Sequence, residues 1–233
     1  MLRNNNQLSN TNMEEVFKMA VVTISRQFGI GGSKITRQLG SSLGWRFYGN
    51  DLADKIAEKM ELSNEDILNY QKQLAFTSKW EASAFGGRLA FFETNSMDEK
   101  KYRKILVETV NEFADRNNII FLGWGCQCIL KERPNTFHFR LVADMDLRLK
   151  IIRSYYRNPE DIPTNKMLEH ILNHKDKQRR QYIRKHFKAN VENPGLYHSV
   201  FNLSKLGIER VVDLMLKIVR NEPSMMYRPQ AVA

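Results

Sequence analysis

A run of glycines near the N-terminus has the residue types and spacing of a phosphate-binding loop. The glycines follow a short apolar segment, Val21 to Ile24, and precede an amphipathic segment with apolar residues at i, i+4 spacing. A strand, a glycine turn and a helix in this order expose several backbone N–H groups at the positive end of the helix, where phosphate oxygens bind. The phosphate loop that we expect comprises Gly29, Ile30, Gly31, Gly32 and Ser33.

The loop departs from the G-x-x-x-x-G-K-[ST] consensus at two positions. When Gly31 is taken as the second glycine, Arg26 replaces the first glycine and Gly32 replaces the lysine. Ser33 then stands where a hydroxyl would bind Mg²⁺, and the nearest cation on the helix is Lys34, two residues beyond the consensus lysine. The alternative is a tight connection in an α/β domain, with glycine chosen only for its backbone freedom.

Composition and charge set limits on the kind of protein. The 233 residues, 42% hydrophobic and 27% charged, are enough for one α/β domain with a lid or for two small domains, and the net charge of +10 suggests an anionic partner. The N-terminal segment has no apolar run of a secretory signal, and no stretch reaches the ~20 apolar residues of a membrane span. Cys126 and Cys128 are too close together to join distant elements, and reduced thiols in a cytoplasmic protein are expected.

Strand-like and helix-like segments alternate along the chain, which predicts a parallel sheet with helices on both faces. Strands are expected at 20–24, 46–48, 119–122, 136–142 and 197–203. Helices are expected to end at Gly44, to begin at Asn50 or Asp51, and to begin at capping boxes that start at Ser63 and Ser96. A further helix is expected from Asp144 or Asp146 to about 157. A long basic helix is expected to follow and to end at about 187, and a last helix is expected over 208–219.

Taken together, four segments resemble the cytidylate kinase-like family, a branch of the P-loop nucleoside monophosphate kinases. They are ISRQFGIGGSKITRQLGSSLGWRFY, YGNDL, IIFLGWGCQCIL and KDKQRRQYIRKHF with the later YHSVFNLSKLGIERVVDLM. The resemblance implies a three-layer α/β P-loop NTPase fold with a five-stranded parallel sheet, a helical acceptor-binding insertion and a basic lid. It also implies phosphoryl transfer from ATP, with Mg²⁺, to a pyrimidine monophosphate such as CMP or dCMP.

The resemblance divides the chain into regions. It implies one kinase-like domain over 19–220, in which about 50–100 bind the acceptor and about 158–190 form the lid. The segments 1–18 and 221–233 are expected to be loose tails. Residues 72–95 give only a weak helix signal.

The resemblance also assigns residues to roles. Backbone N–H groups of the loop, with Arg26 and Lys34, would bind the ATP phosphates, and Ser33 would bind Mg²⁺. Arg179, Arg180 and Lys34 would offset charge on the moving phosphoryl group. The acceptor would be bound by Tyr48, Asp51, Arg88, Gly123, Trp124, Gly125 and Arg184.

One departure from the family pattern bears directly on the acceptor. The family has Gly-Arg-Gly where this chain has Gly123-Trp124-Gly125, and that arginine is expected to grip the acceptor phosphate. Trp124 cannot form a bidentate phosphate contact. Together with Gly32, it favours the alternative of a nucleotide-binding protein of this fold with little or no kinase activity.

The basic segment Lys175–Lys188 has two simpler interpretations. It is a solvated helix face with an Asp176–Arg180 pair, or part of a nucleic-acid-binding surface, an idea that depends on charge alone. The partners that we expect are nucleotides, rather than nucleic acid or membrane.

Overall fold

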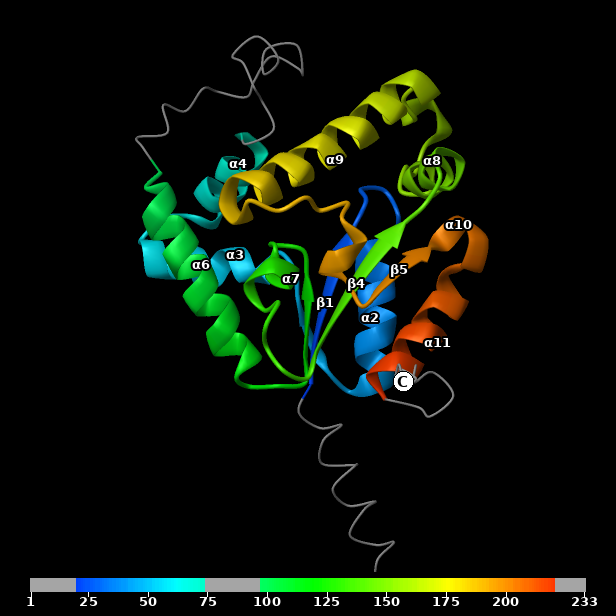
Figure 1. The fold of residues 1–233 in the computed structure, drawn as a ribbon. Coiled ribbons are helices and arrows are strands. Elements are labelled where there is room, and N and C mark those ends of the chain that lie inside the picture. The colour runs from blue at the N-terminus through cyan, green and yellow to red at the C-terminus, as the bar shows by residue number, and fades with distance from the viewer. Residues whose placement is uncertain (1–19, 74–96, 221–233) are drawn as a thin grey trace, which may run out of the picture.

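The computed structural model describes residues 20–73 and 97–220, and it shows a five-stranded parallel sheet with helices on both faces (Figure 1). The strands are β1 (Val21–Arg26), β2 (Arg46–Tyr48), β3 (Ile119–Leu122), β4 (Thr136–Val142) and β5 (Ser199–Asn202), in the order β2-β3-β1-β4-β5. The larger helices are α2 (Gly32–Leu43), α3 (Asp51–Met60), α4 (Asn64–Gln73), α6 (Glu99–Ala114), α8 (Met145–Arg153), α9 (Asn165–Phe187) and α11 (Ile208–Val219). Short helices are α7 (Cys126–Ile129), α10 (Leu203–Leu206), and the 3-10 turns η1 (Pro159–Asp161) and η2 (Pro194–Leu196).

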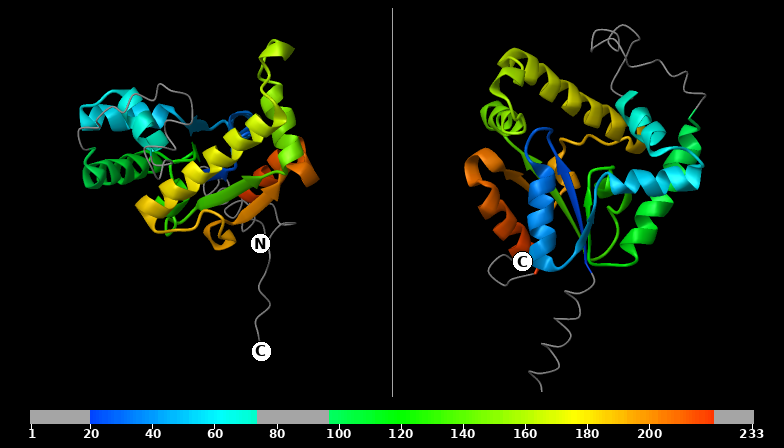
Figure 2. Two further views of the ribbon diagram at one scale, coloured as in Figure 1. Left: turned by 90° about the horizontal axis from the view of Figure 1, so that it is seen from above. Right: turned by 180° about the vertical axis from the view of Figure 1, so that it is seen from behind.

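Two apolar clusters, one on each face of the sheet, make the three layers. On one face α2 and α11 pack on the sheet through buried side chains such as Ile35 and Met215 (Figure 2). On the other face α3, α4, α6 and α7 pack around Phe121 and Leu106. Because β1 lies at the centre of the sheet and both its faces are covered, it reads as a continuous apolar run.

Helices α8 and α9 cross the carboxyl edge of the sheet, above the ends of the strands (Figure 1). They join through a third apolar cluster of Leu149, Leu168 and Leu172, on which Phe28 of the glycine loop also packs. In α/β proteins ligands bind outside the carboxyl ends of the strands. The basic segment of the sequence therefore lies over the edge where a site is expected.

The expected three-layer α/β fold is confirmed, and most element positions agree with it. Helix α2 ends at Gly44 in the left-handed conformation, and the Ser63 capping box is formed, since Ser63 and Asp66 exchange side-chain-to-backbone hydrogen bonds at 3.1 Å. Asp144 caps α8 by accepting from the backbone N–H of Leu147. Beyond Gln73, the segment with the weak helix signal lies outside the described residues, as do both tails.

Four boundaries were wrong by a few residues. The start of α6 is capped by Asp98, because its carboxylate accepts from two backbone N–H groups in the first turn, whereas the expected capping box began at Ser96, which lies outside the described residues. Helix α8 ends at Arg153 rather than about 157. Strand β1 continues to Arg26, which is in register with Leu141 of β4. The last strand is limited to Ser199–Asn202, because η2 precedes it and α10 begins at once after it.

Within the described ranges, no helix combines the length and the apolar character that crossing a membrane requires.

Candidate functional site

The glycine loop leaves β1 after Arg26 and enters α2 at Gly32. Gly29 (φ +81°) and Gly31 (φ +70°) adopt the left-handed conformation that favours glycine. A Cβ added at Gly29 would lie 2.5 Å from Cδ2 of Leu172 on α9, so the absence of a side chain lets α9 approach the loop closely. Between the two glycines, Ile30 is 1% exposed and anchors the loop in the core under α2.

A buried carboxylate on α9 fixes the shape of this loop. Asp176 Oδ1 accepts a hydrogen bond from the backbone N–H of Phe28 at 2.7 Å, and its Oδ2 pairs with Arg148 Nη2 at 2.6 Å. Arg148, on α8, also donates from Nε to the Phe28 carbonyl at 2.9 Å. The Arg148 and Asp176 side chains are buried, so α8 and α9 together hold the Phe28 backbone at both its N–H and its carbonyl.

The simpler interpretation of this segment, a solvated helix face with an Asp176–Arg180 pair, was wrong. Asp176 faces inwards, and the second guanidinium near it is Arg179, at 3.8 Å. Arg180 is exposed and instead meets Glu192, at 3.2 Å, in the segment that follows α9. The i, i+4 spacing predicts that both side chains lie on one helix face, but Asp176 is buried and Arg180 is exposed to solvent.

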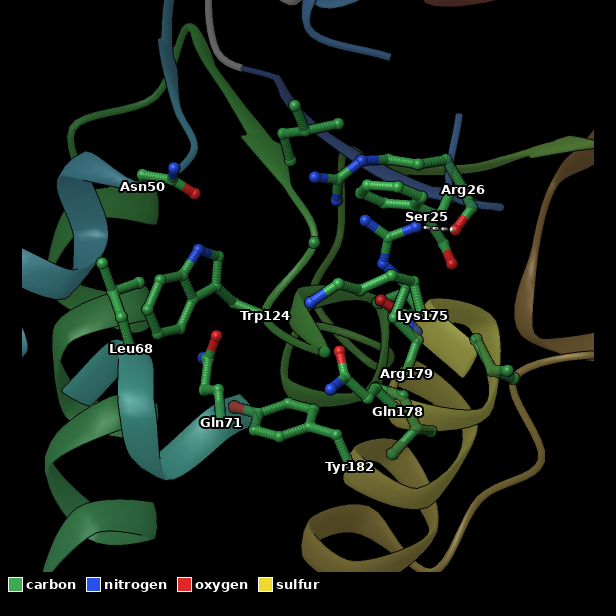
Figure 3. Close-up of a pocket in the computed structure, with 17 residues that line it drawn as sticks. Ser25, Arg26, Asn50, Leu68, Gln71, Trp124, Lys175, Gln178, Arg179 and Tyr182 are labelled. Atoms are coloured by element: carbon green, nitrogen blue, oxygen red, sulfur yellow. Dashed lines mark hydrogen bonds between the residues drawn. The ribbon is translucent and has the colours of Figure 1, made fainter. Parts of the chain in front are cut away.

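A cavity of about 330 Å³ lies at the carboxyl edge of the sheet, between the end of β1, the turn after β3 and α9 (Figure 3). Two sides of it differ in chemistry. The side that we call the basic wall comes from β1 and α9 and consists of Ser25, Arg26, Lys175, Gln178 and Arg179. The opposite side, the neutral wall, consists of Asn50, Leu68, Gln71 and Trp124.

The basic wall carries more positive charge than its surroundings neutralise. Burial, and then the charge of Arg179, lower the pKa of Arg26 to about 9. Burial also lowers the pKa of Arg179 to about 10, against the opposing effect of Asp176. Behind this wall, Arg140 is buried and donates to Ser25 Oγ at 3.2 Å. The guanidiniums of Arg26, Arg140, Arg148 and Arg179 thus lie around the buried Asp176 carboxylate, and this excess of positive charge is the electrostatic pattern of an anion site.

Trp124 forms much of the neutral wall and is held in an unusual conformation. Its φ is +61°, between Gly123 at +91° and Gly125 at +75°, so three successive residues are left-handed. The indole Nε1–H donates to the Gly49 carbonyl at 2.7 Å, and the residue is 9% exposed. This bond ties the turn after β3 to the segment before α3, and it directs an aromatic face, not a cation, into the cavity.

A hydrogen-bonded aromatic cluster supports the neutral wall from behind. Tyr102 and Tyr182 join through their hydroxyls at 3.0 Å, and Tyr102 accepts from Gln71 Nε2 at 3.3 Å. Tyr70 packs edge-on against Tyr102 and lies 3.5 Å, hydroxyl to Nε2, from His186. Burial lowers the pKa of His186 to about 4, so this histidine is neutral at neutral pH.

The structure brings some of the candidate residues to the cavity and leaves others outside it. Those that line it are Arg26, Gly123, Trp124, Gly125 and Arg179. Ser33 and Lys34 lie exposed on the first turn of α2 and do not line it, and Arg184 is exposed on α9. Arg88 lies outside the described residues.

Tyr48 and Asp51 also lie away from the cavity. The ring of Tyr48 stacks on Phe113 with centroids 4.6 Å apart, as part of the apolar core beside β2. Both residues instead line a separate, open depression of about 600 Å³ beside the C-terminal end of α2. The structure thus does not join them to Arg26 and Arg179.

Several lining residues gave no signal in the sequence. Asn50, Gln71 and Gln178 are amides in helical segments, a type of residue that is common on any surface. Arg148 and Arg140 lie in an ordinary helix and an ordinary strand, and only the fold brings them to Asp176 and Ser25. The usable signal was the polar character of residues at the carboxyl ends of strands, since Ser25 and Arg26 end an otherwise apolar run.

The residues present fit a nucleotide-bound Mg²⁺ better than a metal held by the protein alone. In the part of the chain that the structure describes, no group of three or more histidine, cysteine or acidic side chains could hold a metal ion. Mg²⁺ commonly keeps several waters and substrate phosphate oxygens with only one or two protein ligands. The exposed Ser33 hydroxyl on the first turn of α2 is compatible with that arrangement.

The sequence of the described domain matches a family model. Residues 21–205, which include every strand of the sheet, match the model of the cytidylate kinase-like family. The chain belongs to the cytidylate kinase-like family. This membership supports a nucleotide-kinase-like phosphotransferase, in agreement with an arginine-lined cavity at the end of the strand from which the glycine loop leaves. No curated protein matches the sequence significantly.

Solved structures with a similar fold are distant in sequence. An uncharacterized protein from Eubacterium ventriosum is 16% identical, with a TM-score of 0.61 over 88% of this chain and 100% of that one. A shikimate kinase from Bacteroides thetaiotaomicron is 13% identical, with a TM-score of 0.48 over 86% and 98% of the two chains. A gluconokinase from Sinorhizobium meliloti is 10% identical, with a TM-score of 0.45 over 90% and 99%. At these identities the likeness concerns the fold alone.

Proposed function

We propose that the protein is an ATP-dependent nucleoside monophosphate kinase-like phosphotransferase, with a pyrimidine monophosphate such as CMP or dCMP as its acceptor. The observation that carries the proposal is the basic wall, where guanidiniums face open space beside a glycine loop. Phosphoryl transfer needs positioning and charge neutralisation in a closed site more than it needs covalent chemistry. A cytoplasmic location goes with this proposal.

On the donor side, the loop backbone and the arginines would act together. The N–H groups of 29–33 would bind phosphate oxygens at the start of α2, and Arg179 would offset charge on the transferred group. Mg²⁺ would neutralise the ATP phosphates, with the Ser33 hydroxyl as its protein ligand. The ion pair of Asp176 with Arg148 would hold the loop in position for this contact.

On the acceptor side, the neutral wall suits an uncharged ring. Trp124 presents a flat apolar surface for stacking, and the amides of Asn50 and Gln71 offer both donors and acceptors to the edge of a base. A cavity of about 330 Å³ is at the small end for ligand sites, which favours a pyrimidine over a purine.

The test is phosphoryl transfer from ATP and Mg²⁺ to CMP, dCMP, UMP, AMP and GMP, with products separated directly and ATP binding measured in parallel by calorimetry. We expect a diphosphate product from one pyrimidine monophosphate and a much lower rate with both purines. A faster reaction with AMP or GMP would contradict the acceptor assignment. Absence of ATP binding would contradict the proposal as a whole.

The second candidate is a nucleotide-binding protein of the same fold with little or no kinase activity, acting as a sensor or interaction module. It is favoured by Trp124, which stands where the family has a phosphate-gripping arginine. ATP binding without product from any acceptor would support this candidate. Trp124→Arg then discriminates further, because a degraded acceptor site should gain turnover from the added cation, whereas a working site that uses the indole should lose it.

A further inference from the structure

We propose that Arg26 is the phosphate-binding cation of this loop and replaces the lysine that the P-loop consensus has at position 32. The inference deepens the proposed function and rests on it. Relative to the consensus, the chain has exchanged two residue types, with arginine in place of the first glycine and glycine in place of the lysine. The structure shows that these two positions are in contact, so the exchange moves one positive charge across the loop without removing it.

The contact between Arg26 and Gly32 explains both departures at once. A Cβ built on Gly32 would lie 3.0 Å from Cδ and 3.2 Å from Nε of Arg26. The arginine side chain therefore occupies the space that a side chain at position 32 would need. Gly32 begins α2 with an ordinary negative φ, so its backbone does not demand glycine, whereas a side chain at this position would press on Arg26 and require that side chain to shift.

The far end of Arg26 reaches the acceptor side of the cavity. A Cβ built on Gly123 would lie 2.6 Å from Arg26 Nη1, so the guanidinium lies directly against the backbone of the turn after β3. Arg26 thus spans the distance between the start of α2, where donor phosphates are expected, and the turn that carries Trp124. A planar guanidinium at this place can contact donor and acceptor phosphates at the same time, because its five N–H groups form a fork.

Arg26 also lacks the partner that a structural arginine would have. Among the described residues no carboxylate pairs with its guanidinium, and the charge that acts on it is another cation, Arg179, whose Nη1 donates to the Arg26 carbonyl at 3.4 Å. Of the two carboxylates close by, Asp176 is committed to Arg148 and the Phe28 N–H, and Glu192 pairs with Arg180. A partly buried cation beside a like charge is costly without an anion, and a phosphoryl group is the anion that the site would supply.

The chemical step balances with Arg26 as a charge stabiliser only. The bond between the γ-phosphorus of ATP and the β,γ-bridging oxygen breaks, and ADP leaves with the electron pair. A bond forms between the same phosphorus and a phosphate oxygen of the acceptor. With both phosphates ionised no proton changes hands, so Arg26 needs only to remain charged.

The test is a reciprocal exchange of the two residues. We expect Arg26→Gln to lower kcat/KM for phosphoryl transfer by about 10²–10³ and to weaken ATP binding, while the thermal midpoint stays unchanged or rises. Gly32→Lys alone should also lower activity, because its side chain overlaps Arg26. The double variant Arg26→Gly with Gly32→Lys should be at least about tenfold more active than Arg26→Gly alone, since the consensus arrangement is restored. The matched control is Arg37→Gln, an exposed arginine on α2, which should leave activity and ATP binding unchanged.

Each outcome separates this inference from the proposed function. Wild-type turnover that Arg26→Gln retains within about twofold would overturn the role of Arg26 and leave the kinase proposal standing. A double variant no better than Arg26→Gly would overturn it as well, and so would a lowered thermal midpoint for Arg26→Gln, which would indicate a structural arginine. If no acceptor is phosphorylated but ATP binding depends on Arg26, the acceptor assignment fails and the inference stands. Absence of ATP binding by the wild type would overturn both.

Discussion

The basic wall and the neutral wall face each other across one cavity, but they are held in place by different kinds of contact. The basic wall depends on buried charge, since Asp176 joins Arg148 of α8 to the backbone of Phe28. The neutral wall depends on aromatic packing and on hydrogen bonds between uncharged groups, such as that from Trp124 Nε1 to the Gly49 carbonyl. Because salt screens charges, added salt should weaken the contacts of the basic wall more than those of the neutral wall once solvent enters the cavity.

This difference indicates how a ligand would be oriented. The excess of guanidiniums lies on one side, so the most anionic part of a ligand is stabilised there. The side with Trp124 and Gln71 provides no cation among the described residues, and it favours a ring with hydrogen-bonding edges. For the proposed reaction, phosphates belong to the basic wall and the base to the neutral wall.

The largest expected effect comes from removing Asp176, which supports the basic wall. We expect Asp176→Ala to lower the free energy of unfolding by about 3–5 kcal/mol, because it leaves Arg148 buried without its carboxylate and releases the Phe28 N–H. ATP binding should be lost with the loop conformation. Urea unfolding measures the first effect and calorimetry the second. The control Asp213→Ala removes an exposed carboxylate that pairs with Lys217 one turn away, and it should cost no more than about 0.5 kcal/mol.

The neutral wall is tested at Trp124. Trp124→Phe keeps an aromatic ring but leaves the buried Gly49 carbonyl without its donor, and we expect a loss of about 2–3 kcal/mol in the free energy of unfolding. Trp45→Phe is the matched control, since that indole packs in the opposite apolar cluster and its N–H has no hydrogen bond to the described residues. Equal losses for the two variants would show that the Gly49 contact contributes nothing of its own.

A lower pH should destabilise the aromatic cluster that supports the neutral wall. The pKa of His186 is lowered to about 4 in the folded protein, so the unfolded chain, near 6.5, binds the proton more readily. Neutral His186 therefore makes its full contribution to the free energy of unfolding above pH 6.5. As the pH falls towards 4, this contribution is lost and the free energy of unfolding drops by on the order of 1–2 kcal/mol. Stability measured from pH 7 to 4 should fall less steeply in His186→Phe than in the wild type. An unchanged slope would contradict this, and the exposed His170→Gln on the same helix is the control.

The smallest expected effect concerns the residues that cap the helices behind the two walls. Ser63 caps α4, which carries Leu68 and Gln71, with a 3.1 Å bond from the Asp66 N–H. Thr164 caps α9, which carries Arg179, with a longer bond of 3.4 Å from the Met167 N–H. We expect Ser63→Ala to cost about 1 kcal/mol and Thr164→Ala less. Amide hydrogen exchange in α4 and α9 measures both, and a larger effect at Thr164 would refute the ranking.

The sheet could be predicted from the sequence because its signals are local. The apolar runs of β3 and β4, the glycine at the end of α2 and the apolar periodicity of α11 each lie within a dozen residues, and their positions agree with the structure. Boundaries failed where more than one residue in the sequence could cap a helix, as before α6, which Asp98 caps, or where a tertiary contact decides, as at Arg26, whose register with Leu141 lengthens β1.

The candidate site could be predicted only in part, because its parts meet across long stretches of chain. The sequence pointed to the glycine loop and to Arg179, but the bond from Phe28 to Asp176 joins residues 148 positions apart, and no spacing rule predicts it. The same holds for the contact of Arg26 with Gly123, which depends on β1 and β3 being neighbours. Tyr48 illustrates the opposite case, since the family resemblance implied a ligand contact while its ring packs on Phe113.

Two glycines let α9 lie close to the turns that border the cavity. A Cβ at Gly29 would meet Leu172 at 2.5 Å, and one at Gly125 would meet the Phe187 ring at 2.2 Å. These contacts lie fifteen residues apart on α9, about 22 Å along its axis, so the helix touches the glycine loop about a third of the way along its length and the β3 turn at its end. Between these two points Asp176 also holds the Phe28 N–H, so α9 cannot move away from the sheet as a rigid body unless these contacts separate. A larger side chain at either glycine would push α9 away from the turn beside it, and the width of the cavity is thus set in part by residues that have no side chain.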